Sequence, residues 1–128
     1  MKLKSILILS FMLIAACSGR SLDESDSALT EVHLQSGFYG HVTVWVNDEI
    51  VYDEIMSDQV PFAGPQDKFS LSISRGTALI KVSWGASDSK MTDDFSVQIG
   101  SLDKYFLGIN IVNNSLSLTL QNTEFLYL

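Results

Sequence analysis

Residues 69–84 read FSLSISRGTALIKVSW, and their alternation of apolar and polar side chains decides the fold class. The apolar positions are Phe69, Leu71 and Ile73 before Arg75-Gly76, and Ala78, Ile80, Val82 and Trp84 after it. A period of two residues is that of a β-strand with one buried face and one solvated face. The stretch therefore predicts two strands joined by a turn at the glycine.

The same period recurs along most of the chain and predicts an all-β protein. We expect eight or nine short strands, near residues 30–35, 40–47, 50–55, 57–62, 68–74, 77–84, 93–100, 104–112 and 115–128, the last being one strand or two. Asn47-Asp48, Arg75-Gly76 and Asn113-Asn114 tolerate the positive φ of tight turns and predict antiparallel hairpins. The spacing favours an antiparallel two-sheet β-sandwich, with a small β-barrel as the alternative.

The composition narrows the classes of function. The chain has 128 residues, enough for one domain, and its 15 acidic and 8 basic side chains give a net charge of −7. A nucleic-acid-binding protein needs a basic face, so we expect no nucleic-acid partner. The single cysteine, Cys17, excludes an internal disulfide and a multi-cysteine zinc site.

The N-terminus has the pattern of a signal peptide. Lys2 and Lys4 precede an apolar run over residues 6–16, which as a helix would extend about 16 Å, half of a ~30 Å bilayer core. The run ends in Ile14-Ala15-Ala16-Cys17, which resembles the lipobox of bacterial lipoproteins. The resemblance implies cleavage before Cys17 and covalent lipid on it, which would hold the protein on a membrane. The alternative is a secreted protein with a free thiol.

The lipobox resemblance also predicts the organisation and location of the chain. We expect a signal peptide over residues 1–16, a flexible acidic and serine-rich tether over 17–30, and one β-sandwich domain over 31–128. Ser18 after the cysteine, in place of aspartate, implies sorting to the outer membrane in a bacterium with two membranes. The domain would then face the periplasm and contact the membrane through its lipid anchor.

Recognisable catalytic motifs are absent from the sequence. It contains no nucleophile elbow, no His-Glu-x-x-His zinc motif and no phosphate-binding glycine loop. The two histidines, His33 and His41, fall on different predicted strands, and we expect each to face solvent. Because the lone cysteine is assigned to lipid, we expect no thiol catalysis. Since the other catalytic motifs are also absent, we expect no catalytic residues, no enzyme activity and no cofactor beyond that lipid.

Acidic residues near predicted loops are candidates for a calcium site. Asp88, Asp93 and Asp94 could contribute, because Ca²⁺ takes oxygen ligands from loops that meet at one end of a sandwich. The alternative interpretation is that these charges serve solubility and keep strand edges from pairing with other chains.

The candidate binding face consists of Thr43, Trp45, Ile50 and Tyr52, on the two strands that flank Asn47-Asp48. With a two-residue turn, Trp45 lies opposite Ile50 and shares an aromatic outer face with Tyr52. A three-residue loop shifts the register by one, sets Trp45 opposite Val51 and turns Tyr52 into the core. A further alternative is that another segment covers Trp45.

These features favour a non-enzymatic protein-binding or assembly module. It would dock another envelope protein through a sheet edge or through the face around Trp45. The alternative is a carbohydrate-binding module in which Trp45 with Tyr52 or Trp84 stacks on a glycan. Ser36-Gly37-Phe38-Tyr39 resembles the serine–glycine motif of lipoprotein lysozyme inhibitors, although its tyrosine stands one residue early and no second motif follows.

The segment from Phe69 to Val82 carries one more resemblance. Its strand, glycine turn and second strand are similar to a unit common in transthyretin-like and immunoglobulin-like bacterial domains. The similarity implies the fold class and no site. Small transthyretin-like lipoproteins with this architecture take part in the assembly of envelope machines. By analogy of fold, the resemblance implies that the present chain could have such a role.

Overall fold

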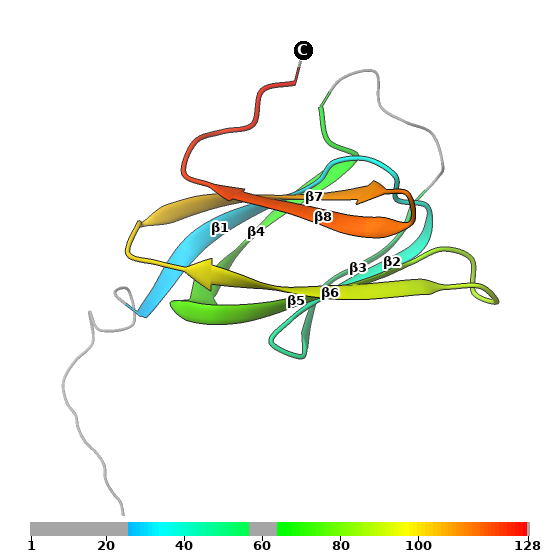
Figure 1. Cartoon of the computed structure of the whole chain (residues 1–128), viewed down its shortest axis with the longest axis horizontal. Helices are drawn as coiled ribbons and strands as arrows, with labels where there is room; N and C mark the ends of the chain where they lie inside the picture. Colours follow the sequence, from blue (N-terminus) through cyan, green and yellow to red (C-terminus); the bar gives the residue numbers. More distant parts are fainter. Residues whose placement is uncertain (1–25, 57–63, 128) are drawn as a thin grey trace, which may run out of the picture.

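The computed structural model describes residues 26–56 and 64–127, which form two four-stranded sheets packed face to face (Figure 1). The strands are β1 (Ser27–Leu34), β2 (Gly40–Val46), β3 (Glu49–Met56), β4 (Asp67–Ser74), β5 (Gly76–Trp84), β6 (Met91–Ile99), β7 (Lys104–Val112) and β8 (Ser115–Gln121). One sheet has the order β4-β1-β7-β8 and the other the order β3-β2-β5-β6. The predicted all-β two-sheet sandwich is confirmed, and the sheets do not close into a barrel.

Neighbouring strands pair antiparallel except β1 and β7, which are parallel. β1 begins at Ser27, so the predicted end of the tether at residue 30 falls inside a strand. β8 ends at Gln121, and the chain then leaves the sheet instead of extending it to the C-terminus. The strand predicted near 57–62, the signal peptide and the lipobox lie outside the described residues. No helix in the described part of the chain is long and apolar enough to cross a membrane.

The core lies between the sheets and is built from alternating side chains of the strands, together with Phe38 from the segment between β1 and β2. The fully buried large side chains are Val32, Leu34, Phe38, Val42, Val44, Ile73, Ile80, Val82, Trp84, Ile99, Leu107 and Ile109. Burial of a side chain of this size contributes roughly 1.5–3 kcal/mol. Because core-facing side chains alternate with outward-facing ones along each strand, a register slip of one residue would turn the core face of that strand outward.

The turn at Arg75-Gly76 is not a hairpin, contrary to the prediction. β4 belongs to one sheet and β5 to the other, so the chain crosses the sandwich at Gly76, where φ is +104°. The alternation is the same in both arrangements, because the inward residues face the core either way. Asn47-Asp48 and Asn113-Asn114 do form tight hairpin turns, with positive φ at all four residues.

The backbone of residues 39–41 lies close to the backbone of Gly85 at the end of the sandwich where β2 begins. His41 N donates a hydrogen bond to the Gly85 carbonyl at 3.1 Å, and Gly85 N donates to the Tyr39 carbonyl at 2.9 Å. Gly40 has a φ of +71°, and a Cβ added to it would lie 2.3 Å from the Gly85 carbonyl oxygen. Only glycine meets both requirements at this position.

We expect Gly40→Ala to lower the free energy of unfolding more than Gly76→Ala. Both substitutions force a side chain into the left-handed region, at about 1–2 kcal/mol. A Cβ at Gly76 meets nothing within 4 Å, whereas at Gly40 it must displace backbone. Urea unfolding of the two variants measures the difference. Equal losses in the two variants would contradict the close backbone contact.

Candidate functional site

The hairpin of β2 and β3 combines both predicted registers. Beside its two-residue turn, Trp45 pairs with Ile50. The register then shifts, because Val51 forms a β-bulge, and Tyr52 pairs with Val44. Trp45 and Ile50 therefore share the outer face of the sheet, as the first register predicts, while Tyr52 turns into the core, as the second predicts.

Two members of the predicted binding face are buried. Tyr52 stacks on Phe69 with ring centroids 5.0 Å apart, and its hydroxyl donates a 2.6 Å hydrogen bond to Asp67. Burial, and then the Asp67 carboxylate, raise the pKa of Tyr52. Thr43 lies on the outer face but is also buried, and its hydroxyl donates to Asp53 at 3.0 Å. The structure thus brings together only two of the four predicted side chains on accessible surface.

The accessible pair is Trp45, which is half-buried, and Ile50, which is 57% exposed. Lys81 of the neighbouring strand places its ammonium group 4.9 Å from the centre of the Trp45 ring. This cation–π contact already occupies a face of the ring that a sugar would need. Trp84, the other aromatic candidate, is fully buried. Of the aromatic side chains predicted for this face, Trp45 is thus the one that remains accessible, with Lys81 against its ring.

His41 belongs to a hydrogen-bonded chain on the outer face of the same sheet. Lys90 can only donate, and it donates to His41 Nδ1 at 2.8 Å, so the ring proton lies on Nε2 and is shared with Asp53. The hydrogen bond from His41 lowers the pKa of Asp53. The hydroxyl in the chain, Thr43, donates to Asp53 and not to His41. The arrangement lacks the nucleophile–base bond of a hydrolase triad.

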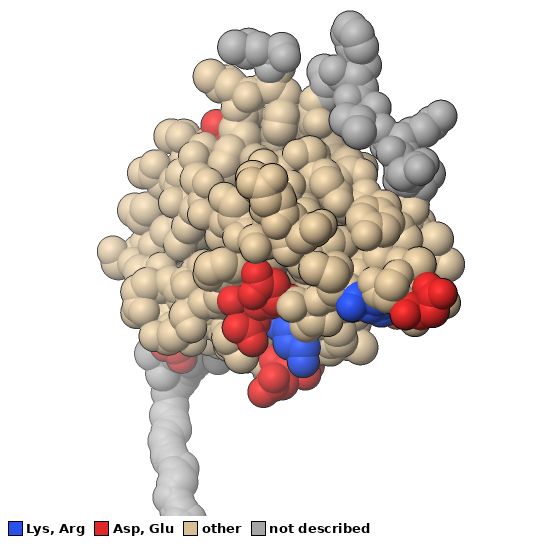
Figure 2. Space-filling view, turned by 45° about the vertical axis from the view of Figure 1, so that its right-hand side comes forward, with Lys and Arg blue, Asp and Glu red and all other residues tan. Residues whose placement is uncertain are grey.

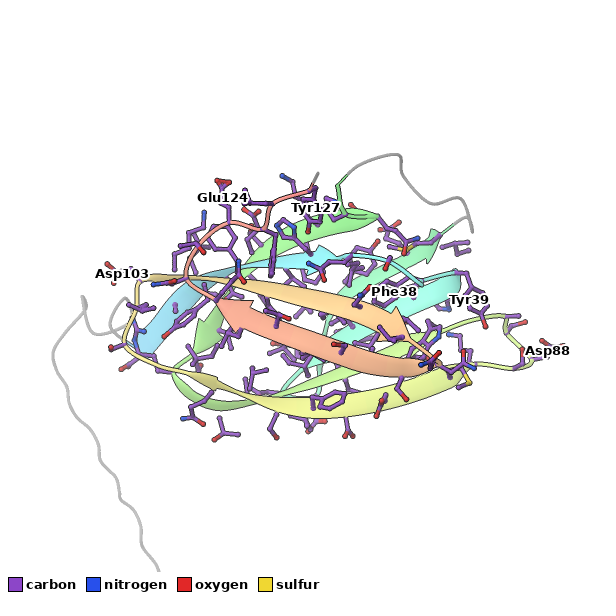
Figure 3. All side chains as sticks on the ribbon, turned by 45° about the horizontal axis from the view of Figure 1, so that its top comes forward. Phe38, Tyr39, Asp88, Asp103, Glu124 and Tyr127 are labelled. Atoms are coloured by element: carbon purple, nitrogen blue, oxygen red, sulfur yellow. The ribbon has the colours of Figure 1, made fainter. Side chains whose placement is uncertain are left out.

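His33 is 5% exposed, contrary to the expectation that it faces solvent. Its Nε2 lies 2.7 Å from Glu31 and its Nδ1 lies 2.7 Å from the Tyr127 hydroxyl. The Tyr127 ring stacks on the His33 ring, with centroids 5.8 Å apart. Figure 3 shows Tyr127 on the C-terminal segment. Phe125 packs at the position where Gly108 would carry a Cβ, 2.8 Å away. The C-terminal segment therefore covers the outer face of this sheet.

The consecutive apolar residues Tyr105-Phe106-Leu107 were the signal for this covering segment. All three are buried, although alternate side chains of one strand point to opposite faces of the sheet. A strand that reads as a continuous apolar run needs cover on both faces. The sequence alone does not reveal that residues 122–127 supply the cover.

The acidic calcium candidates do not converge. Asp88 lies in the loop at one end of the sandwich (Figure 3), whereas Asp93 and Asp94 lie within β6. Asp93 Oδ2 accepts a 3.3 Å hydrogen bond from the Leu116 amide, and Oδ1 accepts one from the Asp94 amide. Among the described residues no group of three His, Cys, Asp or Glu side chains could hold a metal ion.

The Ser36-Gly37-Phe38-Tyr39 segment has structural contacts. The Ser36 hydroxyl donates to the Asn110 side chain, and Phe38 is buried in the core. The Gln66 side-chain amide makes two hydrogen bonds to the backbone of Phe38. Its Oε1 accepts from the Phe38 amide and its Nε2 donates to the Phe38 carbonyl, both at 2.9 Å. These contacts fix the crossover from β1 to β2.

A cleft of about 570 Å³ lies along the edges of β6 and β8, between the two sheets. It is lined by Phe95, Ser96, Val97, Gln98, Leu116, Ser117, Leu118 and Leu120. None of these residues is charged. Phe95 is 40% exposed, and Leu118 and Leu120 are half-buried, so apolar surface is accessible there. In the view of Figure 2, charged side chains are confined mainly to the lower part of the visible face, and a broad area above them is uncharged.

β8 differs in charge from the other three edge strands of the described sheets. β3 carries Glu49, Asp53 and Glu54, β4 carries Asp67 and Lys68, and β6 carries Asp93 and Asp94. The seven residues of β8, SLSLTLQ, include no charge and no proline. Charges, prolines and bulges are the usual protection of an edge against pairing with another chain. β8 has none of them.

The backbone of β8 has one edge that pairs with no further strand of its sheet, where the Leu116 amide donates to the Asp93 side chain. Its hairpin with β7 has a two-residue turn, so Ser115, Ser117 and Thr119 direct their backbone groups toward β7. The backbone N–H and C=O groups of Leu116, Leu118 and Leu120 point away from β7. The Leu116 amide fits this pattern, because it reaches across to Asp93. The edge and the cleft together form the candidate site, which we call the β8 site.

Comparison with known protein families finds no match, and comparison with curated proteins also finds none. The β8 site and the sequence patterns are therefore the basis on which the function is proposed.

The contact between Glu31 and His33 predicts a pH dependence of stability. The hydrogen bond from His33 lowers the pKa of Glu31 below its ordinary value of 4.5, and Lys68 and Lys104 act in the same direction. A lowered pKa in the folded state stabilises the fold above the unfolded value and loses that effect as the pH falls. We expect Glu31→Gln to lower the unfolding free energy by about 1 kcal/mol at pH 7 and by less at pH 3.

Urea unfolding at pH 7, 5, 4 and 3 measures this difference. Glu124→Gln, on the exposed C-terminal segment, is the matched control. A difference between wild type and Glu31→Gln that is the same at all four pH values would contradict the prediction.

Proposed function

We propose that the chain is a lipid-anchored protein of the bacterial cell envelope that acts as a non-enzymatic protein-binding or assembly module. It binds its partner by strand addition at the β8 site. The anchor is the lipid on Cys17, and the domain faces the periplasm from the outer membrane. No cofactor beyond the lipid is part of this proposal.

The single observation that carries the proposal is the uncharged edge of β8 beside the apolar cleft. Strand addition gains affinity from backbone hydrogen bonds and specificity from alternate side chains that enter pockets. Leu116, Leu118 and Leu120 face inward and line the cleft. A strand added to β8 would continue the sheet and place its own inward side chains over Phe95.

The other functions considered have less geometric support. A glycan-binding platform would need an accessible aromatic face, but Lys81 lies on Trp45. A hydrolase of the triad type would need a nucleophile in contact with its base, but His41 lies between Lys90 and Asp53. Strand addition requires neither feature, because the backbone supplies the contacts.

The anchor can be tested separately from the binding mode. We expect the wild-type chain to incorporate labelled fatty acid and to enter the detergent phase on Triton X-114 partition. Cys17→Ser should lose the label completely, because the thioether cannot form on a hydroxyl. Ser18→Ala is the matched control and should keep it. Label retained by Cys17→Ser would overturn lipidation at this residue.

The binding mode can be tested by site-specific photo-crosslinking in the bacterium that makes the chain. A photoreactive residue at Thr119, which is exposed on β8, should form an adduct with a protein. The same residue at Ser72 should not, because Ser72 is exposed on β4, the opposite edge of the same sheet.

The outcomes of this experiment separate the alternatives. An adduct from Thr119 that disappears when Ser117 is replaced by lysine supports binding at the β8 site. Adducts of equal yield from Thr119 and Ser72, or none from either, would overturn strand addition at β8.

A further inference from the structure

We propose that the strand added to β8 is β8 of a second copy of the chain, paired antiparallel about a two-fold axis at Leu118. The inference rests on the proposed function, of which it names the partner. The result is one continuous eight-stranded sheet shared by two copies. A closed two-fold interface uses the same surface of each copy, so that surface must be complementary to itself.

The sequence of β8 is symmetric about Leu118 in chemical type. Antiparallel pairing at this centre sets Leu116 against Leu120, Ser117 against Thr119, and Leu118 against its own copy. Leucine therefore meets leucine on the inward face, and hydroxyl meets hydroxyl on the outward face. Both kinds of cross-strand pair stabilise a sheet.

The free backbone groups match the same register. The residues of β8 whose backbone groups point away from β7 are Leu116, Leu118 and Leu120, and in this register they form the hydrogen-bonded pairs of the new ladder. The two Leu118 residues can exchange an amide–carbonyl pair of hydrogen bonds. The Leu116 amide, which donates to Asp93 at 3.3 Å, would instead donate to the Leu120 carbonyl of the second copy.

Electrostatics favour β8 over the other edges as the contact between two copies. The whole sequence has a net charge of −7, and cleavage before Cys17 would remove Lys2 and Lys4 and make each copy more negative, so any approach between copies is repulsive on average. Self-pairing of β3 would bring together two sets of Glu49, Asp53 and Glu54. Self-pairing of β8 brings no charges together. Antiparallel pairing also keeps the two Asp93 carboxylates apart, because each lies beside Leu116 at opposite ends of the interface.

The β8 site has accessible apolar surface that a second copy would bury. Phe95 is 40% exposed on the inward side of β6, across the cleft from β8. Two copies related by the axis place their clefts beside one another, which removes Phe95 and Leu118 from water. Anchoring in one membrane would raise the effective concentration of copies and favour the pairing.

The test introduces like charges at Ser117 and Thr119, which are uncharged and exposed and face each other across the axis. The variants are S117K/T119K and S117E/T119E, with S70K/S72K on β4 as the matched control. The association of the full chain in detergent micelles is measured by sedimentation at increasing concentration. Thermal unfolding of each variant verifies that it is folded.

We expect the wild type and the S70K/S72K control to dimerise. Each β8 variant alone should dimerise at least about tenfold more weakly, because two like-charge pairs face each other per dimer. An equal mixture of the lysine and glutamate variants should regain a dimer that contains one copy of each.

Two results would overturn the inference. A wild type that stays monomeric at all concentrations removes the second copy as the partner. If the Thr119 crosslink then contains a different protein, strand addition at β8 stands and only the identity of the partner is wrong. A wild-type dimer that both β8 variants form equally well would place the contact between copies on another surface.

Discussion

The burial of one face of every strand against the opposite sheet is the constraint on which the rest of the structure depends. It sets the register of each strand, because a slip of one residue would exchange core and solvent faces. The hairpin of β2 and β3 shows how the constraint is met when local chemistry conflicts with it. Asn47 and Asp48 adopt the positive φ of a two-residue turn, which by itself would direct Tyr52 outward. The bulge at Val51 adds one residue, so both the turn and the burial of Tyr52 are satisfied.

The outer faces of the two sheets differ because one of them is covered. Over the β4-β1-β7-β8 sheet, Phe125 and Tyr127 pack on Gly108 and His33, and the His33 ring has a hydrogen-bonding partner at each nitrogen. A buried imidazole is tolerated there because both of its polar atoms are satisfied. The outer face of the other sheet is occupied by contacts among polar side chains and by Lys81 on Trp45. Exposed apolar side chains also lie on β3, where Ile50 is 57% and Ile55 is 84% exposed. Among the described edge strands, however, β3 carries three acidic residues and β8 carries no charge.

An open sandwich has four strand edges, and charge distinguishes them in this protein. Acidic side chains on β3 and β6, and a mixed pair on β4, make pairing of those edges with another chain unfavourable. An edge without such protection can pair with other chains. In a protein that has no strand-adding partner this leads to aggregation, whereas in one that binds by strand addition it forms the binding site. The contrast between β8 and the other edges therefore supports a binding role for β8. A lipid anchor would add a further restriction, because it limits the encounters of the domain to partners in the same membrane or compartment.

The sequence by itself determined the all-β class, the two tight asparagine turns and most of the core, because a period of two residues reports directly which side chains share a face. It could not distinguish the hairpin at Arg75-Gly76 from a crossing between sheets, because both arrangements bury Ile73 and Ala78. It also allowed both registers at Tyr52, because a bulge leaves the alternation on either side intact. The burial of His33 and the exposure of the β8 edge were decided only by the tertiary structure. Both depend on which segments lie beside a strand in space, and alternation along a single strand carries no information about its neighbours.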